Sequence, residues 1–112
     1  MINDPKALRF VERRIKSRMK CNYPAVIQGS DSSGLKFEEN GKVINMSRSG
    51  VFMVLNKPIP DCREVLVRIL IPTGILEIGS SKLSMVGTIV RLDALDTGAI
   101  GVAIKFNNYR IT

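Results

Sequence analysis

Regular alternation of apolar residues is the feature that most limits what this chain can fold into. Between residues 64 and 71, Val65, Val67, Ile69 and Ile71 occupy every second position. In a strand such residues share one face, so the pattern predicts a β-strand with one buried side. Similar apolar segments recur along the chain and are separated by residues typical of turns. The chain is therefore expected to be built mostly of β-structure.

Six main strands and one minor strand are predicted from this pattern. The main strands are expected at residues 25–28, 42–46, 51–55, 64–71, 83–92 and 99–106. The minor strand, at residues 35–37, is expected to end in a turn at residues 38–41. In the fifth main strand, one side is expected to carry Val86, Thr88, Val90 and Leu92. Closely spaced, turn-linked strands favour an antiparallel barrel or sandwich.

The first twenty residues have a different character. Asp4 and Pro5 have the residue types of a helix N-cap and first turn, and apolar residues then recur at helical spacing, which predicts a helix over residues 5–16. The helix should end before Pro24, because the residue preceding proline favours extended geometry. Residues 1–20 are thus expected to form a short helix or flexible arm, and residues 21–112 the β-domain.

Positive charge is concentrated in this arm. The chain carries a formal net charge of +7, of which residues 1–20 contribute +5 and residues 21–112 contribute +2. A near-neutral body with a cationic arm points to an anionic partner. A solvated helix face would give the same composition, so charge alone does not decide between the two interpretations.

The other chemistry-bearing residues favour a binding protein over an enzyme. Cys21 and Cys62 are far apart in sequence and there is no histidine, so no metal site is expected. Most carboxylates fall in predicted turns, without a pair at catalytic spacing, and no glycine-rich phosphate loop is present. The sequence has no apolar leader and no run of membrane-spanning length. We therefore expect a reduced, cytoplasmic protein without membrane insertion.

Two short motifs carry the functional signal. The first is an arginine pair four residues apart, Arg14 and Arg18, preceded directly by Arg13. A spacing of four places both side chains on the same face of a helix or of a strand, so the pair can converge on one ligand. The planar guanidinium group binds phosphate with two hydrogen bonds, contacts guanine and stacks on purines. Alone, this pattern also occurs by chance in basic helices.

The second motif is the NxSxxG pattern formed by Asn45, Ser47 and Gly50. Asn45 and Ser47 are two residues apart at a predicted strand end, so they should point to the same side and offer an amide and a hydroxyl to a guanine edge. Gly50 is expected to allow a positive φ and a close backbone approach in a tight turn. An ordinary hairpin turn uses the same residue types.

Taken together, the two motifs resemble those of the PilZ domain family, in which RxxxR precedes a barrel and [D/N]xSxxG follows between two apolar strands. The resemblance extends from Arg13 to Phe106 and includes residues 23–26, 50–53, 87–91 and 100–106. It implies a six-stranded antiparallel PilZ-type β-barrel. Many family members carry a further helix after the last strand, but residues 107–112 are too few for a stable helix.

The resemblance also implies a function. PilZ domains bind the bacterial second messenger cyclic di-GMP, and the chain is expected to be a receptor that changes the conformation of its arm and signals to an effector protein. Arg14 and Arg18 match the RxxxR arginines, which close over the ligand. Asn45, Ser47 and Gly50 match the residues that hold a guanine from the barrel surface. No other cofactor is expected.

Arg13 bears on how many ligands bind. In PilZ domains the residue before RxxxR resembles a selector, in which an arginine accompanies two stacked ligands and a bulky apolar residue accompanies one. Two cyclic di-GMP molecules bring four negative charges together, and a third arginine offsets part of that repulsion. We therefore expect two mutually stacked cyclic di-GMP molecules per chain. Arg13 could also be only one more solvated charge at the end of the helix.

Two other interpretations compete with this one. A small basic barrel that binds RNA or single-stranded DNA would use the same cationic arm, but such proteins add aromatic stacking platforms. The aromatic residues here are few and several occupy core-like positions: Phe10, Tyr23, Phe37, Phe52, Phe106 and Tyr109. DNA or RNA is therefore not the expected partner. A barrel that has lost its ligand and acts as an adaptor is disfavoured by the intact motifs.

Overall fold

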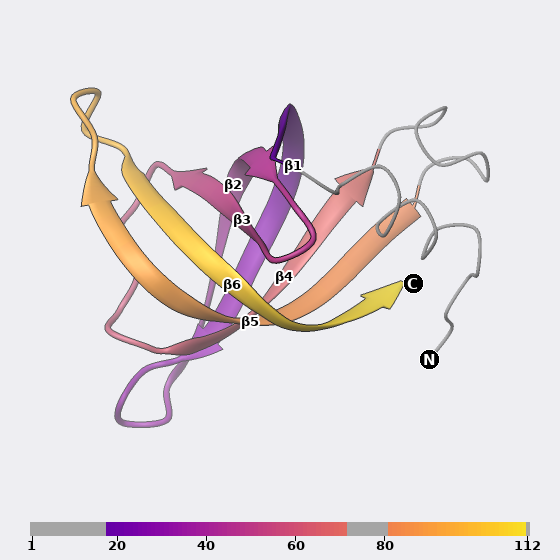
Figure 1. Cartoon of the computed structure of the whole chain (residues 1–112). Coiled ribbons are helices and arrows are strands. Elements are labelled where there is room, and N and C mark those ends of the chain that lie inside the picture. The colour runs from indigo at the N-terminus through magenta and orange to yellow at the C-terminus, as the bar shows by residue number, and fades with distance from the viewer. Residues whose placement is uncertain (1–17, 72–80, 112) are drawn as a thin grey trace.

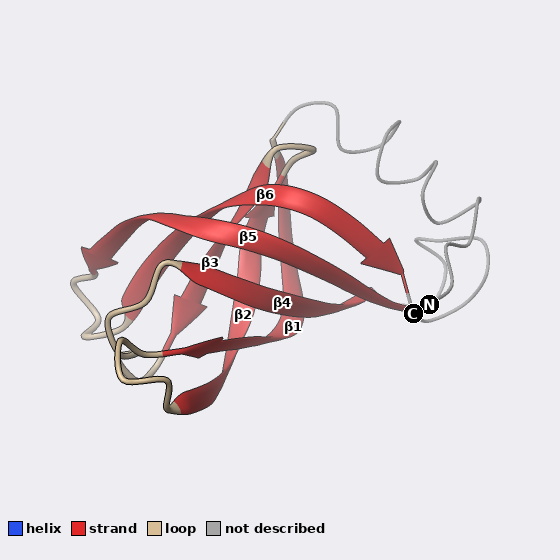
Figure 2. Cartoon of the chain, turned by 90° about the horizontal axis from the view of Figure 1, so that it is seen from below, coloured by secondary structure: helices blue, strands red, loops and turns tan. Residues whose placement is uncertain are grey.

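The described part of the chain is built entirely of β-strands. In the computed structural model, residues 18–71 and 81–111 are described, so the helix predicted over residues 5–16 lies outside them. Six antiparallel strands close into a barrel in the order β1-β2-β3-β6-β5-β4 (Figure 1). A second view shows the same strands joined by loops (Figure 2). The strands are β1 (Met19–Ser30), β2 (Lys36–Met46), β3 (Gly50–Leu55), β4 (Glu64–Ile71), β5 (Ser81–Ala94) and β6 (Ile100–Ile111).

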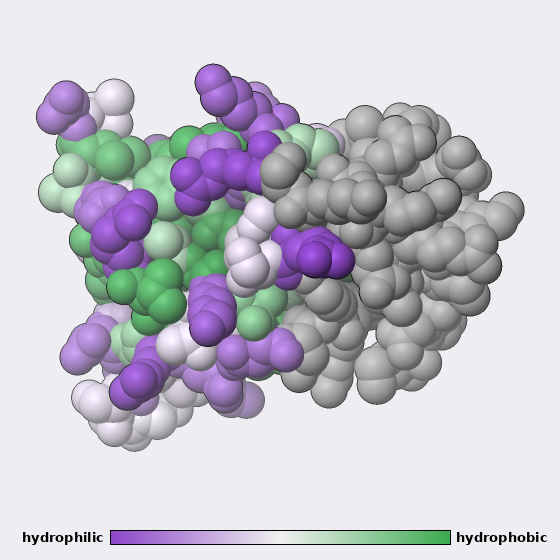
Figure 3. All heavy atoms as spheres, in the orientation of Figure 1, coloured by the Kyte–Doolittle hydropathy of each residue, from purple (hydrophilic) through white to green (hydrophobic). Residues whose placement is uncertain are grey.

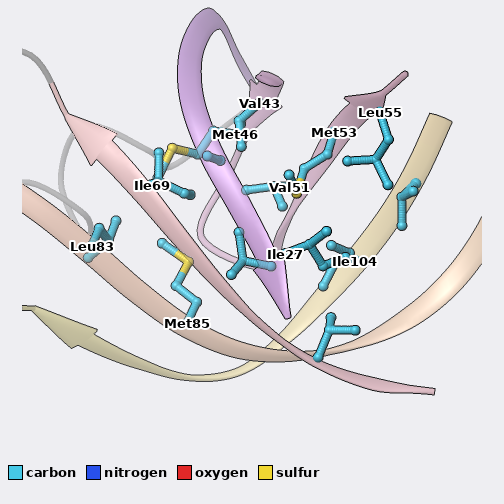
Figure 4. Packing of buried hydrophobic residues seen from close by; sticks show 14 of the residues in the cluster. Ile27, Val43, Met46, Val51, Met53, Leu55, Ile69, Leu83, Met85 and Ile104 are labelled. Carbon is cyan, nitrogen blue, oxygen red and sulfur yellow. The ribbon is translucent and has the colours of Figure 1, made fainter. Parts of the chain in front are cut away.

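The expected fold class is confirmed by this architecture. The interior of the barrel is filled by alternate residues of the strands, because successive side chains of a strand point to opposite faces. In β4, Val67 and Ile69 are completely buried, whereas Arg68 between them is exposed. Figure 4 shows Met46, Ile69 and Met85, from three different strands, converging on the same apolar interior. Across the described ranges, no helix has the length and apolar character needed to cross a bilayer.

Two pairings between distant parts of the sequence close the barrel. β1 pairs with β4 over five residues, beginning with Ala25 opposite Ile69. β3 pairs with β6 along its full length, with Val51 opposite Ile104. The β4–β5 pairing ends where Glu64 lies opposite Thr88. Because β5 continues to Ala94, its C-terminal part extends beyond β4 and is paired with β6 alone among the strands.

The turn expected at residues 38–41 is wrong, because β2 passes through this segment as one continuous strand. The chain reverses earlier, after Asp31. The Asp31 carboxylate accepts hydrogen bonds from the backbone N–H groups of Ser33 and Leu35, both at 2.9 Å. Gly34 completes the turn with a φ of 88°, a conformation that favours glycine. These bonds also lower the pKa of Asp31, most strongly through the Ser33 side chain.

The turn-like residues of β2 have a different explanation. Glu38 and Asn40 are the exposed, outward positions of the strand, where polar residues are expected. Gly41 faces inward, and a Cβ there would lie 2.5 Å from a side-chain carbon of Leu55. The glycine is therefore required by barrel packing and does not mark a chain reversal.

The expected arrangement of β5 is also wrong. A bulge between Ile89 and Arg91 shifts the register against β6, and such an extra residue changes which side the following side chains face. Val90 and Leu92 are 61% and 50% exposed. The residues of β5 that face or pack against the core are Leu83, Met85 and Ile89.

The C-terminal strand is longer than predicted. Val102 and Ile104 are buried, as their alternation indicated, but β6 continues to Ile111 through pairing with β5. Residues 107–111 thus extend a strand. Cys21 and Cys62 are half-buried free thiols, and burial raises the pKa of each. Both also pack against the edge of the apolar core.

Candidate ligand-binding site

A pocket of about 290 Å³ opens on the outer surface of the barrel. It lies where the start of β1 passes the β2–β3 turn and the adjoining parts of β5 and β6. Arg18, Asn45, Ser47 and Gly50, four of the six residues proposed from the two motifs, line it together. Arg13 and Arg14 lie outside the described residues. The described lining residues are Arg18, Asn45, Met46, Ser47, Ser49, Gly50, Val51, Phe52, Val90, Arg91, Ala103, Ile104 and Lys105.

Asn45 reaches the pocket because β2 has a bulge just before it. The register against β3 shifts between Val43 and Asn45. Val43 and Met46 are both buried although they are three residues apart, and the residues between them are half-buried. The bulge therefore rotates the end of β2 so that Asn45 and Ser47 flank the inward-pointing Met46. Their expected placement on a common side of the strand end agrees with this geometry.

Arg18 is brought to the same place by β1. Lys20 in β1 lies directly opposite Asn45 in β2. Arg18 immediately precedes the strand, is exposed, and lines the pocket beside Asn45. Arg18 and Asn45 are 27 residues apart in sequence. The antiparallel pairing of β1 with β2 therefore brings the two motifs together.

Ser47 organises the turn between β2 and β3. Its N–H donates to the Gly50 carbonyl at 2.9 Å. Its hydroxyl oxygen accepts from the Ser49 N–H at 3.2 Å and lies 3.1 Å from the Ser49 hydroxyl. The hydroxyl thus has a structural role as well as a place in the pocket wall.

The expectation of a positive φ at Gly50 is wrong. Among the described residues, only Gly34 and Gly98 have positive φ. Gly50 is instead the first residue of β3, and a Cβ there would collide with the backbone carbonyl oxygen of Ile104 in β6. The close backbone approach that the motif predicted is present, but it joins two strands and does not tighten a turn.

The motifs missed every pocket residue that lies beyond them, including the aromatic and charged side chains of Phe52, Arg91 and Lys105. A row of opposed residues crosses four strands, from Asn45 to Phe52, Ala103 and Arg91. The Arg91 guanidinium carbon lies 5.9 Å from the centre of the Phe52 ring, within the range of a cation–π contact. In the sequence these are ordinary outward positions of separate strands, and only the strand register could have grouped them.

The electrostatic character of the pocket is cationic. Arg18, Arg91 and Lys105 line it, and none of its described lining residues is a carboxylate. Asp93 lies close by, and its carboxylate is paired with the Arg91 Nε at 2.8 Å. Asn45 and the serines add uncharged hydrogen-bonding groups. Such a wall suits a ligand that combines negative charge with a polar ring edge.

Comparisons with known proteins bear on the family and the fold of the chain. The family model described as PilZ domain matches residues 12–112. No curated protein sequence gives a significant match. Among solved structures, a proposed oxidoreductase from Sinorhizobium meliloti 1021 is similar with a TM-score of 0.57 and 9% sequence identity. The match covers 99% of this chain but 49% of that protein. At this identity, the likeness concerns the fold alone.

Proposed function

Because the chain belongs to the PilZ domain family, whose members are cyclic di-GMP receptors and not catalysts, we propose that it is a cytoplasmic receptor for this ligand. The observation that carries the proposal is the pocket in which Arg18 meets Asn45, Ser47 and Gly50. Two motifs separated in sequence supply, in one place, the charge and the hydrogen bonds that cyclic di-GMP needs.

The charge of the pocket supports an anionic ligand. Cyclic di-GMP carries two phosphate charges. Arg18, Arg91 and Lys105 line the pocket, and none of its described lining residues is a carboxylate. We propose that Arg18 binds phosphate or a guanine face, as its fork geometry allows. Asn45 and Ser47 bind the guanine edge, and Lys105, which lies opposite Gly50 in the neighbouring strand β6, contributes further positive charge.

Arg13 and Arg14 complete the proposed site from the segment that precedes Arg18. Their sequence positions place them within a few residues of the pocket, and together with Arg18 they provide the cations for two stacked ligands. Closure of this segment over the ligand would create a new surface for an effector protein. This switch is the means by which we propose that binding is signalled.

Calorimetric titration with cyclic di-GMP tests the proposal. Arg18→Ala should weaken binding by about 2–5 kcal/mol, in the range found when one partner of a close charge pair is removed. Arg68→Ala is the matched control, because Arg68 is an exposed arginine on the outer surface of β4 and does not line the pocket. Both variants should melt like the unmutated protein, since neither side chain belongs to the core.

Specific outcomes would contradict the proposal. Absence of binding by the unmutated protein, or a loss of tenfold or less in Arg18→Ala, would do so. Retardation of RNA or single-stranded DNA at physiological salt, without cyclic di-GMP binding, would favour the nucleic-acid interpretation instead. Phe52 is the single aromatic residue among the described pocket lining, which offers little stacking area for such a polymer.

A further inference from the structure

The C-terminal part of β5 presents an open strand edge. β4 begins opposite Thr88, and the Ile89 N–H donates to the Arg63 carbonyl at 2.8 Å. From there β5 runs on to Ala94 with β6 on one side only. In Figure 1 this stretch forms the outer limb of the β5–β6 hairpin. An exposed edge of this kind can pair with another strand, and natural proteins usually protect it.

The direction of the backbone groups along this edge follows from the hairpin. The Leu95 N–H donates to the Ala99 carbonyl at 3.0 Å, toward β6. In antiparallel strands, alternate residues direct both backbone groups to the same neighbour. Asp93 therefore also faces β6, while Leu92 and Ala94 direct their N–H and C=O groups away from it. Within the described ranges, neither residue has a backbone hydrogen-bond partner on that outer side.

The side chains on the two sides of Leu92 are complementary in charge. The order is apolar, cationic, apolar, anionic, apolar, in Val90, Arg91, Leu92, Asp93 and Ala94. All but Asp93 are exposed, and the Asp93 side chain is still 38% exposed. Figure 3 shows apolar side chains gathered over β5 and β6 on this face, with hydrophilic groups around them.

We propose that this edge pairs with the same edge of a second copy of the chain. In an antiparallel pairing centred on Leu92, the two Leu92 residues exchange backbone hydrogen bonds. Arg91 of each copy then lies opposite Asp93 of the other, in the closer, non-hydrogen-bonded type of pair. Val90 lies opposite Ala94. The pairing is two-fold symmetric, as an isologous dimer requires.

Charge complementarity selects a second copy over other partners. Any antiparallel strand could satisfy the backbone, but this sequence places opposite charges across from one another when it meets itself. The stretch carries one cation and one anion, so the net charge of +7, which is concentrated in residues 1–20, does not oppose the contact locally. A five-residue edge buries less area than a stable interface needs, so a weak, concentration-dependent dimer is expected.

Sedimentation velocity over a range of chain concentrations, without ligand, tests the pairing independently of the proposed function. The unmutated protein should show a reversible monomer–dimer equilibrium. Arg91→Asp places two carboxylates opposite each other, and Asp93→Arg places two guanidinium groups opposite each other. Each variant should weaken self-association at least tenfold.

A mixture of the two variants provides the decisive measurement. In the mixed pair, both aspartates of one chain face both arginines of the other, so a one-to-one heterodimer should form although each variant alone self-associates at least tenfold more weakly. Lys42→Asp and Asp96→Arg apply the same charge changes outside the paired stretch and should leave the dimer unchanged. A strictly monomeric unmutated protein, variants that dimerise normally, or a mixture that stays monomeric would each overturn the proposal.

Discussion

At the scale of single residues, Gly50 shows how a binding motif can also be a packing requirement. A Cβ at this position would collide with the Ile104 carbonyl oxygen. Gly50→Val should therefore separate β3 from β6, lower the melting temperature and weaken cyclic di-GMP binding together. Ser47→Ala is the comparison, because it removes hydroxyl contacts worth about 0.5–1.5 kcal/mol each without adding bulk. An unchanged melting temperature in Gly50→Val would contradict the strand-contact explanation.

Arg13 sets the expected stoichiometry. Titration of the unmutated protein should give two cyclic di-GMP molecules per chain, because a third arginine lowers the repulsion between stacked ligands. Arg13→Leu should reduce this ratio to one while Arg18 and Asn45 still hold a single ligand. Calorimetry reports both the ratio and the affinity. A ratio of one for the unmutated protein would refute the two-ligand proposal even if binding were tight.

At the scale of elements, the β1–β2 hairpin depends on one carboxylate. Asp31 accepts hydrogen bonds from Ser33 and Leu35, and these hold its pKa below the ordinary value. A depressed folded-state pKa means that the stabilisation is present above the unfolded pKa of about 4 and is lost as the pH falls through the folded value. Asp31→Ala should lower the melting temperature at neutral pH, and the difference from the unmutated protein should shrink in acid. Melting curves recorded from about pH 2 to about pH 7, on both sides of the reference pKa, would measure this difference. A difference in melting temperature that does not change with pH would exclude this role of Asp31.

The strands also show what the sequence could and could not predict. The alternation in residues 64–71 predicted β4 with its bounds and buried face, because one side of that strand meets the core and the other meets solvent. The bulges before Asn45 and Arg91 could not be predicted from the sequence, because they depend on which strand pairs with β2 and with β5. Gly41 has the residue type of a turn, and its inward contact with Leu55 is tertiary, so the sequence alone does not reveal it.

The candidate site was predictable to a similar extent. The two motifs identified four of the pocket's described residues, since spacing along a strand determines which side chains point together. Phe52, Arg91 and Lys105 come from strands whose neighbours are fixed only when the barrel closes. Spacing along the chain thus predicts the pocket residues of the two motifs. Those on β5 and β6 follow only from the register of the closed barrel.

At the scale of the whole molecule, the barrel places two surfaces side by side. Val90 and Arg91 belong both to the wall of the candidate pocket and to the open edge of β5. If both proposals hold, ligand and second copy would meet at the same arginine, and binding of one should alter the affinity for the other by an equal factor. Repeating the sedimentation series at saturating cyclic di-GMP would measure this linkage, and an unchanged dimer equilibrium would show that the two surfaces act independently.

The order of strands in the closed barrel also has a consequence for how the protein is made. β3 and β5 are separated in space by β6, which is the last of the six strands along the chain. A growing polypeptide therefore exposes the facing edges of β3 and β5 until residues 100–111 have left the ribosome. Contacts between such distant residues also make folding slow, in about milliseconds to seconds for comparable β-barrels. During synthesis the chain passes through a stage at which aggregation competes with folding, and insertion of β6 between β3 and β5 brings that stage to an end.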